Sequence, residues 1–408
     1  MDQPSYCDAC SVSIYTTWPY FVVLAAVLAV MTLPAFSHVD EPINPGVARR
    51  VQSLDGLRGI LALSVVVHHL VTAYKYHFDG IWGWLPSGFY NQLGEASVAM
   101  FFMVTGYLFW RRLVVDDGRT DLPRLYVGRF FRIAPMYLVV VLCMFAVVAH
   151  RTGYRLNVPI HELMTSVGRW LALGIGGAQI PLNGDAHANL VLAGVTWTIG
   201  YEWAFYASLV ALSFVARRKI HLFVAAAAFA VFAACTHPGL AIPGFCLLFA
   251  SGALAASLGV KGYKAEGKVS AILAIAALVA AVHTSPSTYG HVPQIVGLAI
   301  FFTIVSSGNS LFGLLTTPAA ERLGNISYSV YLGQGLAITG FYALPFVRSW
   351  AYQTPLLYWI SAIACSVLLA IVASISYAFI ERPAIRLGKR ITGRGRSAAS
   401  TDLKTCNR

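Results

Sequence analysis

Charged residues are scarce in this chain. Asp, Glu, Lys and Arg make up 11% of its 408 residues, and 57% of the residues are hydrophobic. Because a soluble domain carries about 25% charged residues, this composition excludes a soluble protein. The chain also lacks the segments of alternating hydrophobicity, about ten residues long, that form outer-membrane barrels. Several continuous apolar runs are instead long enough to cross a bilayer as helices, so we expect an all-α polytopic membrane protein.

Paired metal-binding cysteines are also missing. Cys7 and Cys10 form one C-x-x-C pair, but no second ligand pair accompanies it, so no zinc or other metal site is expected. If this end of the chain is extracytoplasmic, the two thiols could be oxidised. Four further cysteines lie in apolar runs and are expected to be small core residues: Cys143, Cys235, Cys246 and Cys365.

Basic residues outnumber acidic ones, 29 to 17, but they cluster in a few loops. This clustering is typical of the cytoplasmic loops of membrane proteins. Nucleic-acid binding would need basic residues interleaved with aromatics on one surface, a pattern that is absent, so no nucleic-acid partner is expected. The lipid bilayer is the expected partner, and we predict a multi-pass protein of the inner (plasma) membrane.

The basic loops also predict the path of the chain through the membrane. The start of the first core span, near Arg58, and the segment RRLVVDDGRTDLPRLYVGRFFR are both predicted to be cytoplasmic. An interfacial or re-entrant helix is expected near 162–175. We expect about ten core transmembrane helices with both ends cytoplasmic: 60–77, 93–110, 133–150, 191–215, 220–235, 240–259, 269–284, 292–307, 326–347 and 356–380.

An earlier apolar run at 14–36 has three interpretations. It can be an extra transmembrane helix, a signal peptide with a weak cleavage site at 35–37, or an extension ahead of a start at Met31; the absence of Lys and Arg before it argues against a signal. We divide the chain into an N-terminal segment with a linker (1–50), a transmembrane domain (51–388) and a cytoplasmic polar tail (389–408). No internal repeat and no appended soluble domain is recognisable.

The stretch SLDGLRGILALSVVVHHL, residues 53–70, places ionisable groups on a membrane helix. Such groups are costly in hydrocarbon, which makes them candidates for a functional site. Arg58 and His69 are eleven residues apart and therefore share a helix face, which Asp55 joins, whereas His68 is turned by about 100°. His69 would lie about 16 Å beyond Arg58, near the middle of the bilayer. The alternative is an interfacial Asp55–Arg58 pair and a structural histidine.

Two arginines, Arg129 and Arg132, are three residues apart and share a helix face at the cytoplasmic surface. Paired guanidinium groups match phosphate oxygens, although positive-inside anchoring alone can explain them. On the 191–215 helix, Glu202 is deep enough in the membrane to need a partner. It can orient His69, act as an acid or base, or form a structural pair with a Tyr or Arg.

Aromatic and polar side chains accompany these charges. Trp197 and Tyr206 lie on the same helix as Glu202. Tyr328, Tyr331 and Gln334 recur every three residues on the 326–347 helix, where they can line a cavity or join two helices. Residues 381–383, Glu-Arg-Pro, are expected to end the last span, because Pro stops a helix.

Taken together, these segments resemble membrane-bound acyltransferase family 3, the O-acyltransferases that modify bacterial surface sugars and some antibiotics. The resemblance covers about residues 51–388. Two positions depart from the family pattern: Gln334 stands where a histidine is common, and Ala99 where an acidic residue is common. The SGNH-type domain of some members is absent. The matching segments occur in family order: SLDGLRG with His69, MFFMVTGYLF, RFFRIAPMY, TWTIGYEWAFY, LGNISYSVYLGQ and FIERP.

The resemblance implies transfer of an acyl group, usually acetyl from acetyl-CoA, to a hydroxyl group. Acyl-CoA is then a donor substrate, and no permanently bound cofactor is expected. The expected acceptor is a lipid-linked or surface glycan such as O-antigen or exopolysaccharide; a secreted small molecule such as a macrolide is the alternative. A transporter or flippase would also place charges in the membrane, but would be expected to show inverted repeats. A scaffold would need no charges at mid-membrane.

The expected roles of the candidate residues follow from this resemblance. His69 is the catalytic base or the acylated nucleophile, with Glu202 or Asp55 fixing its tautomer. Arg58, Arg129 and Arg132 bind the phosphates of the donor. The remaining candidates are expected around the substrate cavity: His68, Trp197, Tyr206, Tyr328, Tyr331 and Gln334.

Overall fold

A computed structural model describes residues 13–41, 51–177, 179–285 and 287–393 of the chain. These residues form helices joined by loops, and they contain no β-strand beyond an isolated bridge between Leu182 and Asp185. The predicted all-α membrane architecture is therefore confirmed. Cys7, Cys10 and the end of the polar tail, 394–408, lie outside the described residues.

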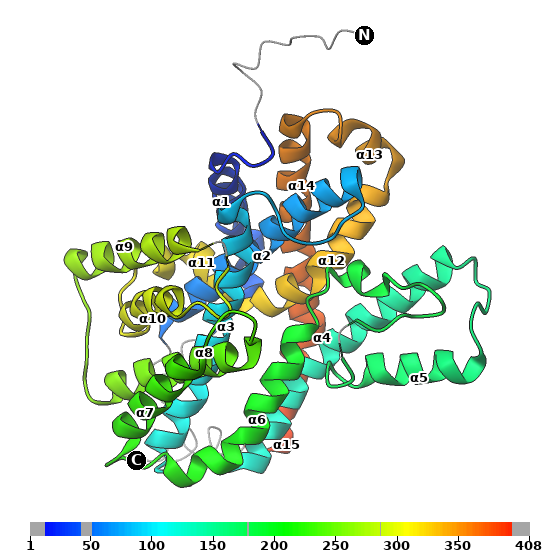
Figure 1. Ribbon diagram of the computed structural model, residues 1–408. Coiled ribbons are helices and arrows are strands. Elements are labelled where there is room, and N and C mark those ends of the chain that lie inside the picture. Colours follow the sequence, from blue (N-terminus) through cyan, green and yellow to red (C-terminus); the bar gives the residue numbers. More distant parts are fainter. Residues whose placement is uncertain (1–12, 42–50, 178, 286, 394–408) are drawn as a thin grey trace, which may run out of the picture.

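The helices follow the order of the predicted apolar runs (Figure 1). The α-helices are α1 (Trp18–Met31), α2 (Gln52–Asp79), α3 (Gly88–Val115), α4 (Leu122–Arg151), α5 (Ile160–Leu171), α6 (Trp197–Val215), α7 (His221–Cys235), α8 (Ala241–Val260), α9 (Lys268–Thr284), α10 (Val292–Ser306), α11 (Pro318–Asn325), α12 (Ser327–Ala343), α13 (Pro345–Ala351), α14 (Pro355–Ser376) and α15 (Arg382–Ile391). Short 3₁₀ turns are η1 (Pro34–Val39), η2 (Ala188–Leu192) and η3 (Leu314–Thr316), and η4 (Tyr377–Glu381) is a π-helix.

Six helices in the described part of the chain are long and apolar enough to cross a membrane: α2, α3, α4, α6, α8 and the continuous α14–α15. A seventh span results if α12 and α13, which are bent by 88°, count as one broken helix. The other expected spans, α7, α9 and α10, are shorter apolar helices, as is α1. Ten crossings therefore stay a prediction, because helix length alone does not decide them.

Several predicted helix ends are wrong, among them those beside the basic segment 111–132 and the end of the last span. The expected spans end at 110 and begin again at 133, but α3 continues to Val115 and α4 already begins at Leu122. Hydropathy reports only the apolar part of a helix, and these helices extend beyond it as polar turns. Pro383 does not end the last helix either. It lies in the first turn of α15, directly after the π-helical turn η4, and the helix continues through it to Ile391.

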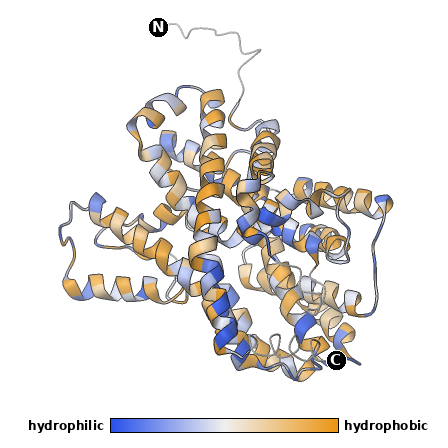
Figure 2. Ribbon diagram, turned by 180° about the vertical axis from the view of Figure 1, so that it is seen from behind, coloured by the Kyte–Doolittle hydropathy of each residue, from blue (hydrophilic) through white to orange (hydrophobic). Residues whose placement is uncertain are grey.

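Helix α2 runs through the interior and packs against α3, α11 and α12 (Figure 1). Its first turns lie so close to α11 that glycine is required there: an added Cβ at Gly324 would overlap the carbonyl oxygen of Asp55. This contact holds the polar start of α2 in a fixed position. Figure 2 shows apolar residues along most helices and hydrophilic residues on the lower half of the long α14–α15 helix.

The cysteines correct one expectation about the core. Cys365 is buried, but Cys143 and Cys235 are exposed and Cys246 is half-buried. An apolar run does not distinguish a side chain in the core from one on the outer, lipid-facing side of a membrane helix, because both environments are apolar.

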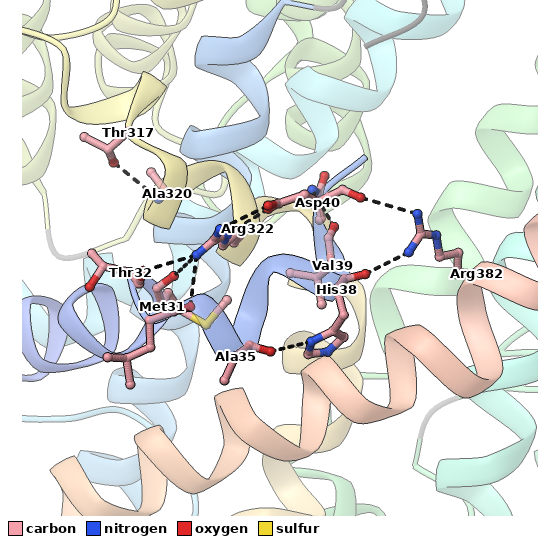
Figure 3. Close-up of polar contacts among 12 residues, drawn as sticks. Met31, Thr32, Ala35, His38, Val39, Asp40, Thr317, Ala320, Arg322 and Arg382 are labelled. Atoms are coloured by element: carbon pink, nitrogen blue, oxygen red, sulfur yellow. Dashed lines mark hydrogen bonds and ion pairs between the residues drawn. The ribbon is translucent and has the colours of Figure 1, made fainter. Parts of the chain in front are cut away.

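The N-terminal segment is joined to the rest of the fold by an arginine clamp, shown in Figure 3. Arg322 of α11 donates to the carbonyl oxygens of Met31, Thr32 and Leu33 at the end of α1, and pairs with both carboxylate oxygens of Asp40 at 2.8 and 3.0 Å. A guanidinium group thus satisfies carbonyls that a helix end leaves unpaired. The run predicted at 14–36 therefore contains a packed helix, α1.

Candidate active site

A cavity of about 530 Å³ lies among α2, α3, α4, α6, α12 and α15. Its wall is strongly basic. Among the described residues it holds seven cationic side chains: Arg58, Arg111, Arg112, Arg124, Arg129, Arg132 and Lys389. Three carboxylates, those of Glu41, Asp55 and Glu202, line it as well. Low-dielectric walls strengthen the field of an excess positive charge, so the cavity suits an anionic ligand.

Arg129 and Arg132 both line this cavity, as expected from their spacing on one helix face. The guanidinium carbon of Arg129 lies 4.7 Å from the ring centroid of Phe109, a cation–π contact that holds the side chain in place. One residue after Arg132, the carbonyl oxygen of Ile133 accepts a hydrogen bond of 2.9 Å from Tyr328 of α12. Helix α4 is therefore anchored to α12 next to its two arginines.

Glu202 of α6 faces the same cavity. Its Oε2 accepts a hydrogen bond of 3.0 Å from the hydroxyl of Tyr206, one helical turn later. Arg129, Arg132 and Arg58 are near enough for their charges to act on this carboxylate. Glu202 therefore lies beside a tyrosine and arginines, which are the neighbours expected for the predicted structural pair with a Tyr or Arg.

The first two turns of α2 bring Asp55 and Arg58 into the cavity wall. Their side chains form an ion pair at 3.7 Å, with 12% of the Asp55 side chain and 17% of the Arg58 side chain exposed. The carboxylate also lies near the N-terminus of α2, where the helix dipole favours a negative charge. Arg58 therefore joins the cationic wall, with Asp55 beside it.

His69 does not line the cavity. It lies farther along α2, in a second group of side chains that includes Gln334 and Trp82. Its Nδ1 lies 3.0 Å from Oε1 of Gln334 on α12, and its ring stacks on Trp82 with centroids 5.9 Å apart. His68 is turned away, as predicted, and its Nδ1 lies 2.8 Å from the carbonyl oxygen of Tyr90. The contact that we expected from Glu202 or Asp55 is thus made by Gln334.

The polar stripe on α12 connects the two groups. Tyr328 and Tyr331 line the cavity, and the carbonyl oxygen of Tyr331 accepts a hydrogen bond of 2.8 Å from the amide of Gln334. The Tyr331 ring meets Phe101 edge to face, with centroids 5.9 Å apart. The stripe therefore extends from the cavity wall to the imidazole of His69.

Trp197 is separate from both groups. It packs in an aromatic cluster with Phe102, Tyr201, Phe245 and Tyr289, with ring centroids 5.6 to 6.2 Å apart, and it does not line the cavity. Its role around the substrate stays a prediction.

The comparisons with known proteins agree with this architecture. A family model described as an acyltransferase domain, of acyltransferase family 3, matches residues 51–375. The chain belongs to acyltransferase family 3. No curated protein and no solved structure matches it. Membership of the family makes the chain an acyltransferase of the membrane.

The acyltransferase cavity contains residues that sequence reasoning missed. From the sequence, Arg111, Arg112 and Arg124 indicate only a cytoplasmic segment, but in the structure they belong to the polar ends of α3 and α4 and line the cavity. Helical spacing contained a signal, because Arg124 lies eight residues, about two turns, before Arg132. Two further cavity residues, Glu41 and Lys389, lie outside the range that the family model matches.

Proposed function

We propose that this acyltransferase moves acetyl from cytoplasmic acetyl-CoA to a hydroxyl group of a cell-surface glycan. The observation that carries the proposal is the basic cavity, with seven cationic side chains against three carboxylates among the described residues. Its volume of about 530 Å³ is within the range of about 300–1,000 Å³ that is usual for small-molecule sites.

The donor side of the reaction uses the arginines. Coenzyme A carries several phosphate charges and cannot enter lipid, so it needs cations at the cytoplasmic surface. Arg129 and Arg132 offer planar forks that bind phosphate oxygens by paired hydrogen bonds, and Arg58 adds a third guanidinium group to the same wall. By the positive-inside rule, this basic end of the protein faces the cytoplasm.

His69 is the proposed general base. In the direct mechanism the acceptor oxygen attacks the thioester carbonyl carbon and gives its proton to His69, and the C–S bond breaks to release the CoA thiolate, which takes up a proton. In the two-step alternative the imidazole is acylated first and then transfers acetyl to the acceptor oxygen. In both cases the thioester has to reach from the cavity past Tyr331 towards Gln334 and His69.

A surface glycan is favoured as acceptor because family membership and a place in the cell envelope both fit it. The acceptor would approach His69 from the side of Trp82, the residue of the α2–α3 loop that stacks on the imidazole. A secreted small molecule with a free hydroxyl group, such as a macrolide, is the alternative acceptor class.

The test is transfer of labelled acetyl from acetyl-CoA into the glycan fraction of membranes that contain the His69→Ala variant. Loss of the base should lower the rate by about 10²- to 10⁴-fold, the usual contribution of general acid–base catalysis. His161→Ala is the matched control, because His161 is an exposed histidine on α5, away from the site. Full transfer by His69→Ala at normal protein levels would exclude this role.

A further inference from the structure

The hydrogen bond between His69 and Gln334 has a defined direction. An amide side chain has a donor end and an acceptor end, and a neutral imidazole has one donor and one acceptor nitrogen. The end of the Gln334 amide that faces His69 and the ring nitrogen that carries the hydrogen must therefore be assigned together. The assignment starts from a neighbouring group that can only donate or only accept.

The backbone of α12 supplies that group. The carbonyl oxygen of Tyr331 can only accept, and it lies 2.8 Å from Nε2 of Gln334. The amide nitrogen must therefore face Tyr331, which leaves Oε1 to face Nδ1 of His69 at 3.0 Å. Because Oε1 can only accept, Nδ1 carries the hydrogen, and in the neutral ring the lone pair is on Nε2.

The surroundings keep this arrangement in place. Gln334 is fully buried, with 0% of the residue exposed, so no solvent competes for its amide. The neighbouring His68 cannot take over the contact, because its own Nδ1 lies 2.8 Å from the carbonyl oxygen of Tyr90. His68 also packs against Gly94, where an added Cβ would lie 2.8 Å from its Cδ2 atom, so only glycine leaves room for the ring in this position.

We infer that Gln334 is a positioning residue, whose side-chain oxygen holds His69 in the tautomer that presents the lone pair of Nε2 to the reacting groups. The inference rests on the proposed role of His69 and deepens it. It replaces Glu202 and Asp55, which lie in the cavity wall, by a neutral amide as the partner of the base. When His69 takes up a proton, Oε1 of Gln334 remains bonded to Nδ1–H and stabilises the imidazolium ion.

Two variants separate the oxygen from the bulk of the side chain. Gln334→Met has a similar length and no hydrogen-bond acceptor of comparable strength, so the ring can adopt the wrong tautomer. We expect kcat to fall by about 10²-fold, at the low end of what a misoriented base costs. The KM for acetyl-CoA should stay within about twofold, because Gln334 does not line the donor cavity. Gln334→Glu keeps an acceptor oxygen, so its kcat should stay within about tenfold of the wild-type value.

Tyr342→Phe is the matched control on the same helix. It removes the 2.9 Å hydrogen bond between the Tyr342 hydroxyl and Ser361, at a position away from His69, and should leave both kinetic parameters unchanged. Folding is checked by thermal denaturation of each purified variant in detergent and by its binding of CoA. Gln334→Ala, which removes the oxygen without adding bulk, replaces Gln334→Met if the latter does not fold.

The outcomes are distinguishable. An active His69→Ala variant would overturn the proposed function of His69 and this inference with it. An inactive His69→Ala variant beside a Gln334→Met variant with wild-type kcat would overturn the inference alone. Equal loss of kcat in Gln334→Met and Gln334→Glu, with CoA binding intact, would also overturn it, because an acceptor oxygen would then make no difference.

Discussion

Arg129 and Arg132 have different neighbours, although they share a helix face. The guanidinium group of Arg129 lies over the ring of Phe109, whereas Arg132 is close enough to the buried Glu381 for their charges to interact. A guanidinium group held over a ring loses little freedom when it binds a phosphate, because its orientation is already restricted. Of the two, Arg129 is therefore the better prepared to bind a phosphate of the proposed donor.

We expect Arg129→Ala to raise the KM for acetyl-CoA by about 10- to 100-fold, with a smaller effect on kcat. This range corresponds to the loss of one charge-assisted hydrogen bond of about 1.5–3 kcal/mol. Arg129→Lys should give an intermediate KM, because it keeps the charge and loses the fork. The measurement is the rate of acetyl transfer as a function of acetyl-CoA concentration.

The control is Arg390→Ala, which removes a charge from α15 next to the cavity residue Lys389 without changing the wall. If Arg390→Ala raised the KM as much as Arg129→Ala, the effect would be one of overall charge. The cavity would then have no specific role for the fork of Arg129.

At the scale of elements, α1 and η1 are held to the transferase domain by arginines from distant helices. Arg322 binds the end of α1 and the carboxylate of Asp40, and Arg382 of α15 donates to the carbonyl oxygen of His38 at 2.7 Å (Figure 3). The hydrogen bond to Asp40 raises the pKa of Arg322 above its ordinary value, so the guanidinium group stays charged at every working pH. Next along the chain, Glu41 lines the cavity and accepts a hydrogen bond of 2.6 Å from Tyr377.

Arg322→Ala should therefore weaken the attachment of α1. We expect a loss of about 1–3 kcal/mol in stability, the usual cost of a partly buried charged hydrogen-bond partner, since 11% of the Arg322 side chain is exposed. The measurement is the midpoint of thermal denaturation in detergent, which should fall relative to the wild type. Arg348→Ala, an exposed arginine on α13, is the control. An unchanged midpoint in Arg322→Ala would mean that apolar packing alone attaches α1.

Helix boundaries show which parts of the elements were predictable. The apolar helices α8 and α9 were predicted within one residue at each end, at 240–259 and 269–284, because hydrophobic runs report the apolar length of a helix. The polar ends of α3 and α4 were missed, because a charged helical turn and a charged loop have similar composition. Three arginines on those ends, Arg111, Arg112 and Arg124, line the cavity, so the prediction missed them as site residues.

At the scale of the whole molecule, the basic cavity is at the end predicted to be cytoplasmic. The loop between α3 and α4 belongs to this end, and α13 belongs to the opposite end, which the topology places outside. The orientation is testable because each of these segments has an exposed residue, Arg119 and Ser349.

Single cysteines introduced by Arg119→Cys and Ser349→Cys in a cysteine-free background should react differently with a membrane-impermeant maleimide. We expect labelling at 349 in intact cells, and labelling at 119 only after the membrane is permeabilised. Labelling at 119 in intact cells would place the cavity outside, where no acyl-CoA is available. Activity of the cysteine-free protein serves as the control for correct folding.

The sequence by itself determined the membrane class, the order of the helices and the basic end of the molecule. These properties depend on local hydrophobicity, charge and helical period, so Arg129 and Arg132 could be placed on one face from their spacing alone. Only the tertiary structure decided which helices meet. Gln334 is 265 residues from His69 and contacts it, whereas Glu202, predicted as its partner, faces the arginines. The physical reason is that helix packing depends on the fit between side chains of distant segments. In an apolar medium, the hydropathy of a helix face also does not reveal whether the face meets lipid or another helix.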